Sequence, residues 1–367
     1  MRPVISNSPI LAVLAACLLL TACTTTPPAQ VFVPPVYPPP PDQPRFVYER
    51  TLLYNDDVEE YTSTDRLKQF ALGASRKLRG LIKPYDVAVN KGRVYVTDTV
   101  QRAVFMFDIP GRRFVEFGTE KPGELAKPMG IDIANSGDVY VADISAKRVL
   151  VYSAEGRYLR NIGSEKRLAR PSDVTVSPDG QQIYVVDTGG IDSPNHDVVV
   201  YDAQDGHYLR TIGRRGIGKG EFNLPLQAAT APDGRLYVVD SGNFRVQIFS
   251  PEGDFLDSFG SVGRAPGQFA RAKGIAIDRD GRIYVVDTAF GNVQIFDPQT
   301  RLLMFIGERG EAGYPGKFML PAGIDVDPDG RIYMVDQFFR KVDVFRPATM
   351  KAESGEAAYI FKGNPDE

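Results

Sequence analysis

The sequence of 367 residues predicts an all-β fold, a six-bladed β-propeller with four-stranded antiparallel blades. One observation is a segment of turn glycine, polar residue, aliphatic residue, Tyr, Val or Met, any residue and Asp that occurs six times. A second is the regular spacing of its final Asp residues, which is 45, 44, 53, 47 and 49 positions. A third is that each unit holds four short stretches with strand periodicity and no helical period. These Asp residues are Asp98, Asp143, Asp187, Asp240, Asp287 and Asp336.

The N-terminus, residues 1–22, is typical of a lipoprotein signal peptide. One early Arg precedes an apolar run at residues 10–20, which is too short to span a bilayer permanently. The sequence LTAC that ends at Cys23 resembles the bacterial lipobox, which implies that Cys23 carries lipid such as palmitate. Because Thr24 rather than Asp follows, the resemblance implies an outer-membrane anchor facing the periplasm. The other interpretation is an ordinary signal peptide cleaved nearby, which would leave Cys23 as a free thiol.

Residues 23–44 are expected to be the lipidated Cys and a Pro-rich tether. Nine of the 28 prolines and no glycine fall in this segment, which favours extended polyproline II. The more specific alternative is that this segment is a Pro-rich ligand for an adaptor domain, but its lack of any basic residue argues against that alternative.

The next segment, residues 45–80, is expected to help close the ring. A propeller must join its first and last blades or leave exposed strand edges. The strand-like Arg45–Tyr54 is the outer strand that we expect in the sixth blade, and the tail EAAYIFKG at residues 356–363 is the competing candidate.

Residues 81–363 are expected to form the six blades. In each unit an apolar first strand, such as GIDIA at residues 130–134, precedes the Tyr-Val-x-Asp strand. A third strand such as RVQIF at 245–249 follows, and a fourth such as FLDSFG at 255–260 ends the unit. Asp-Gly and Pro-Asp-Gly between the first two strands supply the positive φ angles of tight hairpins.

These units resemble the NHL repeat, which reads roughly P-x-G-I-A-V-D, D-G-x-I-Y-V-x-D, R-V-x-x-F and F-x-x-x-F-G. The resemblance covers residues 81 to about 345, and Arg271–Asp297 matches the pattern best. It implies an NHL-type six-bladed propeller in a superfamily that includes zinc-dependent and lactonase-like, calcium-binding enzymes. The fourth copy departs from the pattern at residues 227–229, and the third carries an insert at 188–197.

Composition excludes several classes of protein. A formal charge of −3 provides no field that favours nucleic acid, so no nucleic-acid partner is expected. Two Cys cannot build a disulfide framework, and two His cannot build a His-rich zinc site. The absence of Trp weakens a carbohydrate-binding function, since Trp is the favoured sugar-stacking ring.

The repeated polar residues have a structural interpretation. One Asp per blade at the end of a second strand lies too far from its neighbours to form a calcium site, so we expect strand-end caps that accept backbone N–H bonds. The six repeat Tyr residues are expected to pack between blades. Of the two histidines, His207 is expected to be solvated in a turn. His196, beside Asp192 and Asp197, permits only a weak metal site.

The first strand of each blade should line a central channel. Strand alternation places twelve residues there: Asp86 and Ala88, Gly130 and Asp132, Asp173 and Thr175, Gln227 and Ala229, Gly274 and Ala276, Gly323 and Asp325. One interpretation is a solvated channel without a ligand. The other is a small cationic or metal ligand, calcium included, held by Asp86, Asp173 and Gln227 at the mouth where these strands begin.

The same mouth should be shared with the loops between second and third strands. Their aromatic and Arg content is typical of interaction hot spots, and it is also common in exposed turns of such repeats. The candidate binding residues in these loops are Arg102, Arg148, Arg245, Phe338, Phe339 and Arg340; Lys147, Phe244 and Phe290 accompany them.

The sequence leaves three functions open. The first is a lipid-anchored periplasmic scaffold, with a monomeric body, that binds a protein or another component of the cell envelope. The second is a metal-dependent hydrolase or lyase, and the third is a carbohydrate-binding module. No residue is assigned as catalytic and no metal site is assigned, because propellers host all three functions and the fold alone cannot choose.

Overall fold

The computed structural model describes residues 32–60, 67, 71, 78–190, 192–352 and 354–357. The chain divides into two units, residues 1–33 and Pro34–Glu367, and only Phe32 and Val33 of the first unit are described. The expected signal peptide and Cys23 lie outside the described residues. Among the residues that are described, no helix is both long and apolar enough to cross a membrane.

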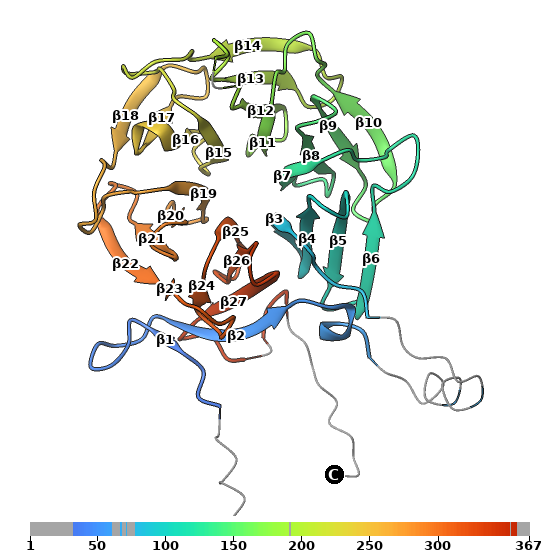
Figure 1. The fold of residues 1–367 in the computed structure, drawn as a ribbon, viewed down its shortest axis with the longest axis vertical. Coiled ribbons are helices and arrows are strands. Elements are labelled where there is room, and N and C mark those ends of the chain that lie inside the picture. Colours follow the sequence, from blue (N-terminus) through green and yellow to red (C-terminus); the bar gives the residue numbers. More distant parts are fainter. Residues whose placement is uncertain are drawn as a thin grey trace, which may run out of the picture. The chain divides into compact units, whose positions relative to one another are not determined.

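The second unit contains six antiparallel sheets arranged as a ring (Figure 1), which confirms the six-bladed β-propeller. The first blade contains β3 (Pro84–Asn90), β4 (Arg93–Asp98), β5 (Ala103–Asp108) and β6 (Arg113–Phe117). The second contains β7 (Pro128–Ile133), β8 (Val139–Asp143), β9 (Arg148–Tyr152) and β10 (Tyr158–Ile162). The third contains β11 (Pro171–Val176), β12 (Gln182–Asp187), β13 (Asp197–Asp202) and β14 (Tyr208–Ile212). The fourth blade contains β15 (Pro225–Thr230), β16 (Leu236–Asp240), β17 (Arg245–Phe249) and β18 (Phe255–Phe259). The fifth contains β19 (Ala272–Ile277), β20 (Ile283–Asp287), β21 (Asn292–Phe296) and β22 (Leu302–Ile306).

The sixth blade combines both ends of the second unit. Its inner strands are β25 (Pro321–Val326), β26 (Ile332–Asp336) and β27 (Lys341–Pro347), and its outer strand is β2 (Phe46–Leu52) from the N-terminal segment. β2 pairs with β27 over six residue pairs, so a strand from the start of the unit closes the ring (Figure 1). The competing tail strand falls mostly outside the described residues.

Part of the expected tether belongs to this blade. β1 (Val36–Tyr37) adds a fifth strand beside β2, and the Tyr37 ring meets Phe345 edge-on at 5.7 Å between ring centroids. An extended tether therefore does not continue to residue 44, because this aromatic side chain finds an apolar partner on the sixth blade.

Three short elements complete the fold. Two are 3-10 turns, η1 (Asn55–Asp57) and η2 (Ser241–Asn243). The third is a parallel pair between β23 (Glu308–Arg309) and β24 (Lys317–Phe318), within the connection that enters the sixth blade.

The apolar core lies between neighbouring blades. In one cluster Tyr184 of the third blade packs with Val238 and Phe249 of the fourth. Tyr95 of the first blade donates a hydrogen bond to the Ala154 carbonyl of the second at 2.8 Å. All six repeat Tyr residues are buried, which confirms their expected role in packing between blades.

The six repeat Asp residues are completely buried strand-end caps, as expected. Asp143 shows the arrangement: its carboxylate accepts hydrogen bonds from the backbone N–H groups of residues 126, 127, 145 and 146, at 2.6–3.0 Å. Each cap ties the start of an inner strand to the loop between the second and third strands. Asp240 departs from this pattern, because it accepts one backbone N–H and three side-chain donors.

Candidate functional site

The six inner strands surround a central cavity of about 510 Å³. Nine of the twelve residues that alternation assigns to the channel line it, and the other three are glycines. Asp86, Asp173 and Gln227 lie at its inner end, where each is nearly completely buried. Exposed residues from the turns between first and second strands, such as Lys91 and Arg279, form its rim. The cavity therefore opens where the inner strands end, and not at the expected mouth where they begin.

Four channel carboxylates each tie their own blade to the next one, in four of the six neighbouring pairs of blades. The inner strands of neighbouring blades share no ladder, so their free backbone N–H groups need other acceptors. Asp86 accepts from the N–H of residue 131 at 3.1 Å, and Asp132 accepts from that of residue 176 at 2.7 Å. Asp173 and Asp325 likewise accept from residues 228 and 89, at 2.8 and 2.7 Å. These contacts give the channel acids a structural function in addition to any ligand function.

The same burial perturbs their ionisation. Burial raises the pKa of Asp86 to about 7, and a hydrogen bond from Gln227 opposes part of that rise. Burial, followed by the charge of Asp86, raises the pKa of Asp173 well above its ordinary value. Burial and the charge of Asp132 raise the pKa of Asp325 in the same way. The cavity thus holds buried carboxyl groups whose pKa values are raised, a property common at functional sites.

The opposite end of the channel is covered by a pair that the sequence analysis missed. Lys273 of the fifth blade places its Nζ 4.3 Å from the centroid of the Tyr85 ring of the first blade, and 3.1 Å from Gln337 Oε1. Because the sixth blade lies between these two blades in the ring, the pair bridges across it. Burial lowers the pKa of Lys273 to about 8. Only the ring arrangement brings these two residues together, since 188 positions separate them.

The candidate residues in the loops lie on this opposite side. None of the six lines the central cavity within the described chain. Arg102, Phe338 and Arg340 are exposed, and the rings of Phe338 and Phe339 meet edge-on at 5.2 Å. The expectation that the channel acids and these loops share one mouth is therefore wrong, because the cavity and the loops face opposite ends of the inner strands.

Two of the loop arginines are less available than the sequence suggests. Arg245 pairs with the buried Asp240 at 2.9 Å and donates to the carbonyls of residues 218 and 221. Arg148 is half-buried, and its Nε lacks a hydrogen-bond partner within the described chain. Arg245 therefore has a structural function, since its guanidinium makes its hydrogen bonds within its own blade.

The two histidines differ in their surroundings. His196 is buried; its Nδ1 accepts from the N–H of Leu224 at 3.1 Å, and its Nε2 lies 3.1 Å from the Gly190 carbonyl. Both ring nitrogens are thus used, Nδ1 in joining the third blade to the fourth and Nε2 within the loop of the third blade, which argues against the weak metal site beside Asp192 and Asp197.

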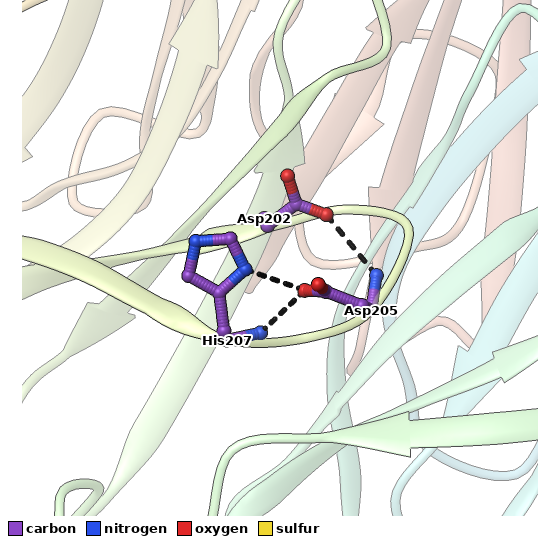
Figure 2. Close-up of side chains that lie close together, drawn as sticks. All are labelled: Asp202, Asp205 and His207. Carbon is purple, nitrogen blue, oxygen red and sulfur yellow. Dashed lines mark hydrogen bonds and ion pairs between the residues drawn. The ribbon is translucent and has the colours of Figure 1, made fainter.

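His207 lies in an exposed turn, as expected (Figure 2). Its Nδ1 is 2.6 Å from Asp205 Oδ1, and Asp202 accepts from the Asp205 N–H at 3.1 Å. Ligand atoms of these three residues lie within 4.8 Å of one another. The hydrogen bonds of the β13–β14 turn account for this grouping, so we assign it no ligand.

Comparisons with known proteins support the fold. The family model for the NHL repeat matches residues 222–249, which contain β15, β16 and β17 of the fourth blade. This is the copy whose first strand departs from the NHL pattern in the sequence. The search of curated proteins found no match.

Several solved structures share the architecture. A gluconolactonase from Xanthomonas campestris is 19% identical with a TM-score of 0.57, over 82% of this chain and 98% of its own. Virginiamycin B lyase from Staphylococcus aureus is 16% identical with a TM-score of 0.53, over 72% of this chain and 95% of its own. A structural genomics protein of unknown function from Bacteroides thetaiotaomicron is 17% identical with a TM-score of 0.57, over 75% of this chain and 71% of its own. Identities this low show shared fold alone. The chain is a six-bladed β-propeller that contains an NHL repeat.

Proposed function

We propose that this protein is a scaffold that binds another protein through its loop face. The loop face comprises the loops between second and third strands together with the two residues that precede each inner strand. Several large apolar side chains are exposed there, and a group of exposed apolar side chains is typical of an interaction site. They are Ile82, Val100, Leu224, Leu320 and Phe338, which is 55% exposed.

Charge on the loop face indicates the chemistry of the partner. Seven of its residues are cationic and only one, Asp192, is acidic. The cations are Lys83, Arg102, Lys127, Lys147, Arg170, Arg271 and Arg340. Apolar side chains surrounded by Arg and Lys suit an acidic protein surface that carries apolar residues at its centre. This combination of exposed apolar groups and one sign of charge is the observation that carries the proposal.

The proposed anchor complements this function. Lipidation of Cys23 would hold the body at the outer membrane, facing the periplasm, where an envelope protein is the accessible partner. The protein and a membrane-bound partner would then be confined to the same membrane surface, and this tethering raises the effective concentration of the partner at the loop face.

Crosslinking in cells with the native N-terminus tests the proposal. We expect Phe338→Ala plus Arg340→Ala to remove the main crosslinked protein, and added salt to weaken the crosslink because exposed charges are screened. The matched control is Leu256→Ala plus Arg157→Ala, which removes an exposed apolar and an exposed cationic residue elsewhere. An unchanged set of crosslinked proteins in the first variant would contradict the proposal.

The alternative is a metal-dependent hydrolase or lyase. The cavity of about 510 Å³, with its carboxyl groups of raised pKa, favours it, and cavities of this size commonly hold small ligands. No Glu or His is among the described residues that line this cavity. Stoichiometric calcium or zinc in purified protein, lost on Asp86→Asn plus Asp173→Asn, would support the enzyme over the scaffold.

A further inference from the structure

One position in the repeat differs between blades in an informative way. It is the first residue of the third strand, which pairs directly with the capping Asp of the second strand in every blade. The residues at this position are Ala103, Arg148, Asp197, Arg245, Asn292 and Lys341. In the fourth and sixth blades its side chain reaches the loop that enters the same blade from the previous one.

In the fourth blade a cation fills the space beside this loop. Arg245 reaches the capping Asp240 at 2.9 Å and the carbonyls of Gly218 and Glu221 at 2.6 and 2.9 Å. Only 16% of the Arg245 side chain is exposed. The guanidinium is therefore surrounded by one carboxylate and two carbonyl acceptors.

In the sixth blade a lysine occupies the same position. Lys341 is buried, and its Nζ donates to the Tyr314 carbonyl at 3.0 Å and to Asp343 at 2.6 Å. Tyr314 corresponds to Gly218, because each lies two residues before a glycine whose N–H binds the third strand. Two blades thus bind a cation at the same carbonyl of the repeat.

The fifth blade has the space without the cation. Asn292 is too short to reach the loop, and a cavity of about 630 Å³ opens beside it. Ala265, Phe290 and Phe305 line this cavity together with Asn292, whose buried Oδ1 lacks a hydrogen-bond partner within the described chain. An amide oxygen without a partner at the edge of a cavity indicates that a donor is missing.

Two of the three acceptors that hold Arg245, the loop carbonyls, have counterparts in the fifth blade. Ala265 corresponds to Gly218, since it lies two residues before Gly267, whose N–H binds Gln294 as that of Gly220 binds Gln247. The carbonyl of Gln268 corresponds to that of Glu221, and both accept from the third strand. The cap Asp287 differs from Asp240, because its completely buried carboxylate already accepts four backbone N–H groups.

We propose that this fifth-blade pocket binds a guanidinium or primary ammonium group, such as the Arg or Lys side chain of a partner or a small cationic ligand. The ligand cation would take a position like that of Arg245 in the fourth blade, near the carbonyl of Ala265. Asn292 Oδ1 would accept one of its N–H groups, and the Phe290 and Phe305 rings would cover its apolar stem. The exposed Arg264 at the rim does not exclude a cation, because in the fourth blade Arg214 contacts the side chain of Glu221, whose carbonyl accepts from Arg245.

Saturation transfer difference NMR on the full-length protein in detergent tests the site with argininamide. Citrullinamide is the matched control ligand, because it has the same shape without the charge. We expect transfer to the side-chain methylene protons of argininamide, and affinity weaker by about tenfold or more for citrullinamide, because hydrogen bonds to charged groups are the stronger ones. Equal transfer to both ligands, or none to argininamide, would overturn the proposal.

Asn292→Arg is the decisive variant. Its own guanidinium should fill the pocket as Arg245 does, so argininamide should no longer bind while the thermal unfolding temperature rises. Leu256→Arg adds the same charge on the exposed outer strand of the fourth blade and should leave binding unchanged. Asn292→Lys, patterned on the sixth blade, repeats the test. Undiminished binding in both folded Asn292 variants would refute the site. The ligand is titrated against the protein alone, so this result is separate from the crosslinking result for the loop face.

Discussion

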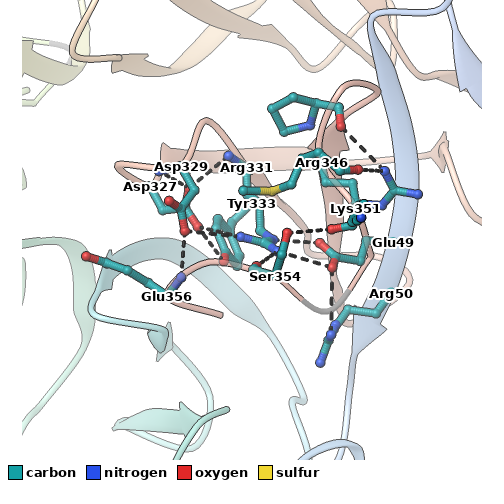
Figure 3. Close-up of polar contacts among 12 residues, drawn as sticks. Glu49, Arg50, Asp327, Asp329, Arg331, Tyr333, Arg346, Lys351, Ser354 and Glu356 are labelled. Atoms are coloured by element: carbon teal, nitrogen blue, oxygen red, sulfur yellow. Dashed lines mark hydrogen bonds and ion pairs between the residues drawn. The ribbon is translucent and has the colours of Figure 1, made fainter. Parts of the chain in front are cut away.

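Arg331 holds together the two ends of the second unit, and its removal should cost more stability than removal of any exposed arginine (Figure 3). Its side chain is 1% exposed and pairs through Nε with Glu49 of β2 at 2.7 Å. The same guanidinium contacts Asp329 at 3.4 Å and donates to the carbonyl of Ser354 in the C-terminal tail. One buried cation therefore joins the closing strand, the sixth blade and the tail.

The perturbation is Arg331→Met, which keeps most of the stem and removes the charge. Glu49, whose side chain is 5% exposed, would then be a buried carboxylate that has lost its close counter-ion and keeps only Arg50, at 3.8 Å. Breaking a buried pair by removal of one partner costs about 3–5 kcal/mol. We expect a loss of this size in the free energy of unfolding.

The fifth blade offers a matched control. Arg282 has the same backbone bond to Asp278 that Arg331 has to Asp327, and each Asp also accepts from a repeat Tyr. The Arg282 side chain is 40% exposed, because no strand covers it. Arg282 also pairs with the buried Asp278 at 2.8 Å, but water reaches its guanidinium and screens the pair, so Arg282→Met should cost less stability than Arg331→Met.

Urea unfolding followed by circular dichroism measures both variants, with the slope against denaturant as a check that cooperativity is unchanged. Glu49→Leu combined with Arg331→Met should recover much of the loss, since replacing a whole buried pair by apolar groups is often neutral. A loss for Arg331→Met no larger than that for Arg282→Met would refute the argument that burial gives this pair its importance.

Three further predictions concern other parts of the chain. Asp197 faces the capping Asp187 in the ladder, and burial raises the pKa of Asp197 to about 7 from an ordinary value of 3.8. The folded state therefore binds more protons than the unfolded state, and it loses stability as pH rises from 4 to 7. Asp197→Asn should therefore raise the free energy of unfolding at pH 8 by about 1–3 kcal/mol with little effect at pH 4, and an equal gain at both pH values would contradict the assignment. Gly323→Ala should cost about 1–3 kcal/mol in urea unfolding, because its Cβ would lie 2.0 Å from Asp86 Oδ1 and 2.5 Å from Asp86 Cα. Cys23→Ser should abolish palmitate labelling and release the protein from the membrane fraction; retained labelling would show that Cys23 is not the lipidated residue.

Local sequence patterns were sufficient for the repeating parts of the fold. The capping Asp residues are predictable because their partners, the loop N–H groups, recur at the same distance along every unit. The alternation of the inner strands identified the channel residues for a similar reason, since strand geometry alone decides which side chains share a face. The function of channel carboxylates such as Asp86 in tying blades together was not predictable, because their partners belong to the next blade.

The sequence by itself determined the six units, their four strands and the caps, because each depends on contacts within about 50 residues that repeat with the period of the chain. The interblade Tyr residues were also predicted, because they recur at the same place in every unit. Only the tertiary structure decided which end of the channel opens and that Tyr85 and Lys273 cover the other end. It also decided that Arg331 is buried while Arg282 is exposed, and that the fifth blade keeps a pocket at Asn292. The physical reason is that closing the ring brings residues of non-adjacent blades and of both chain ends together, and no local period encodes those contacts.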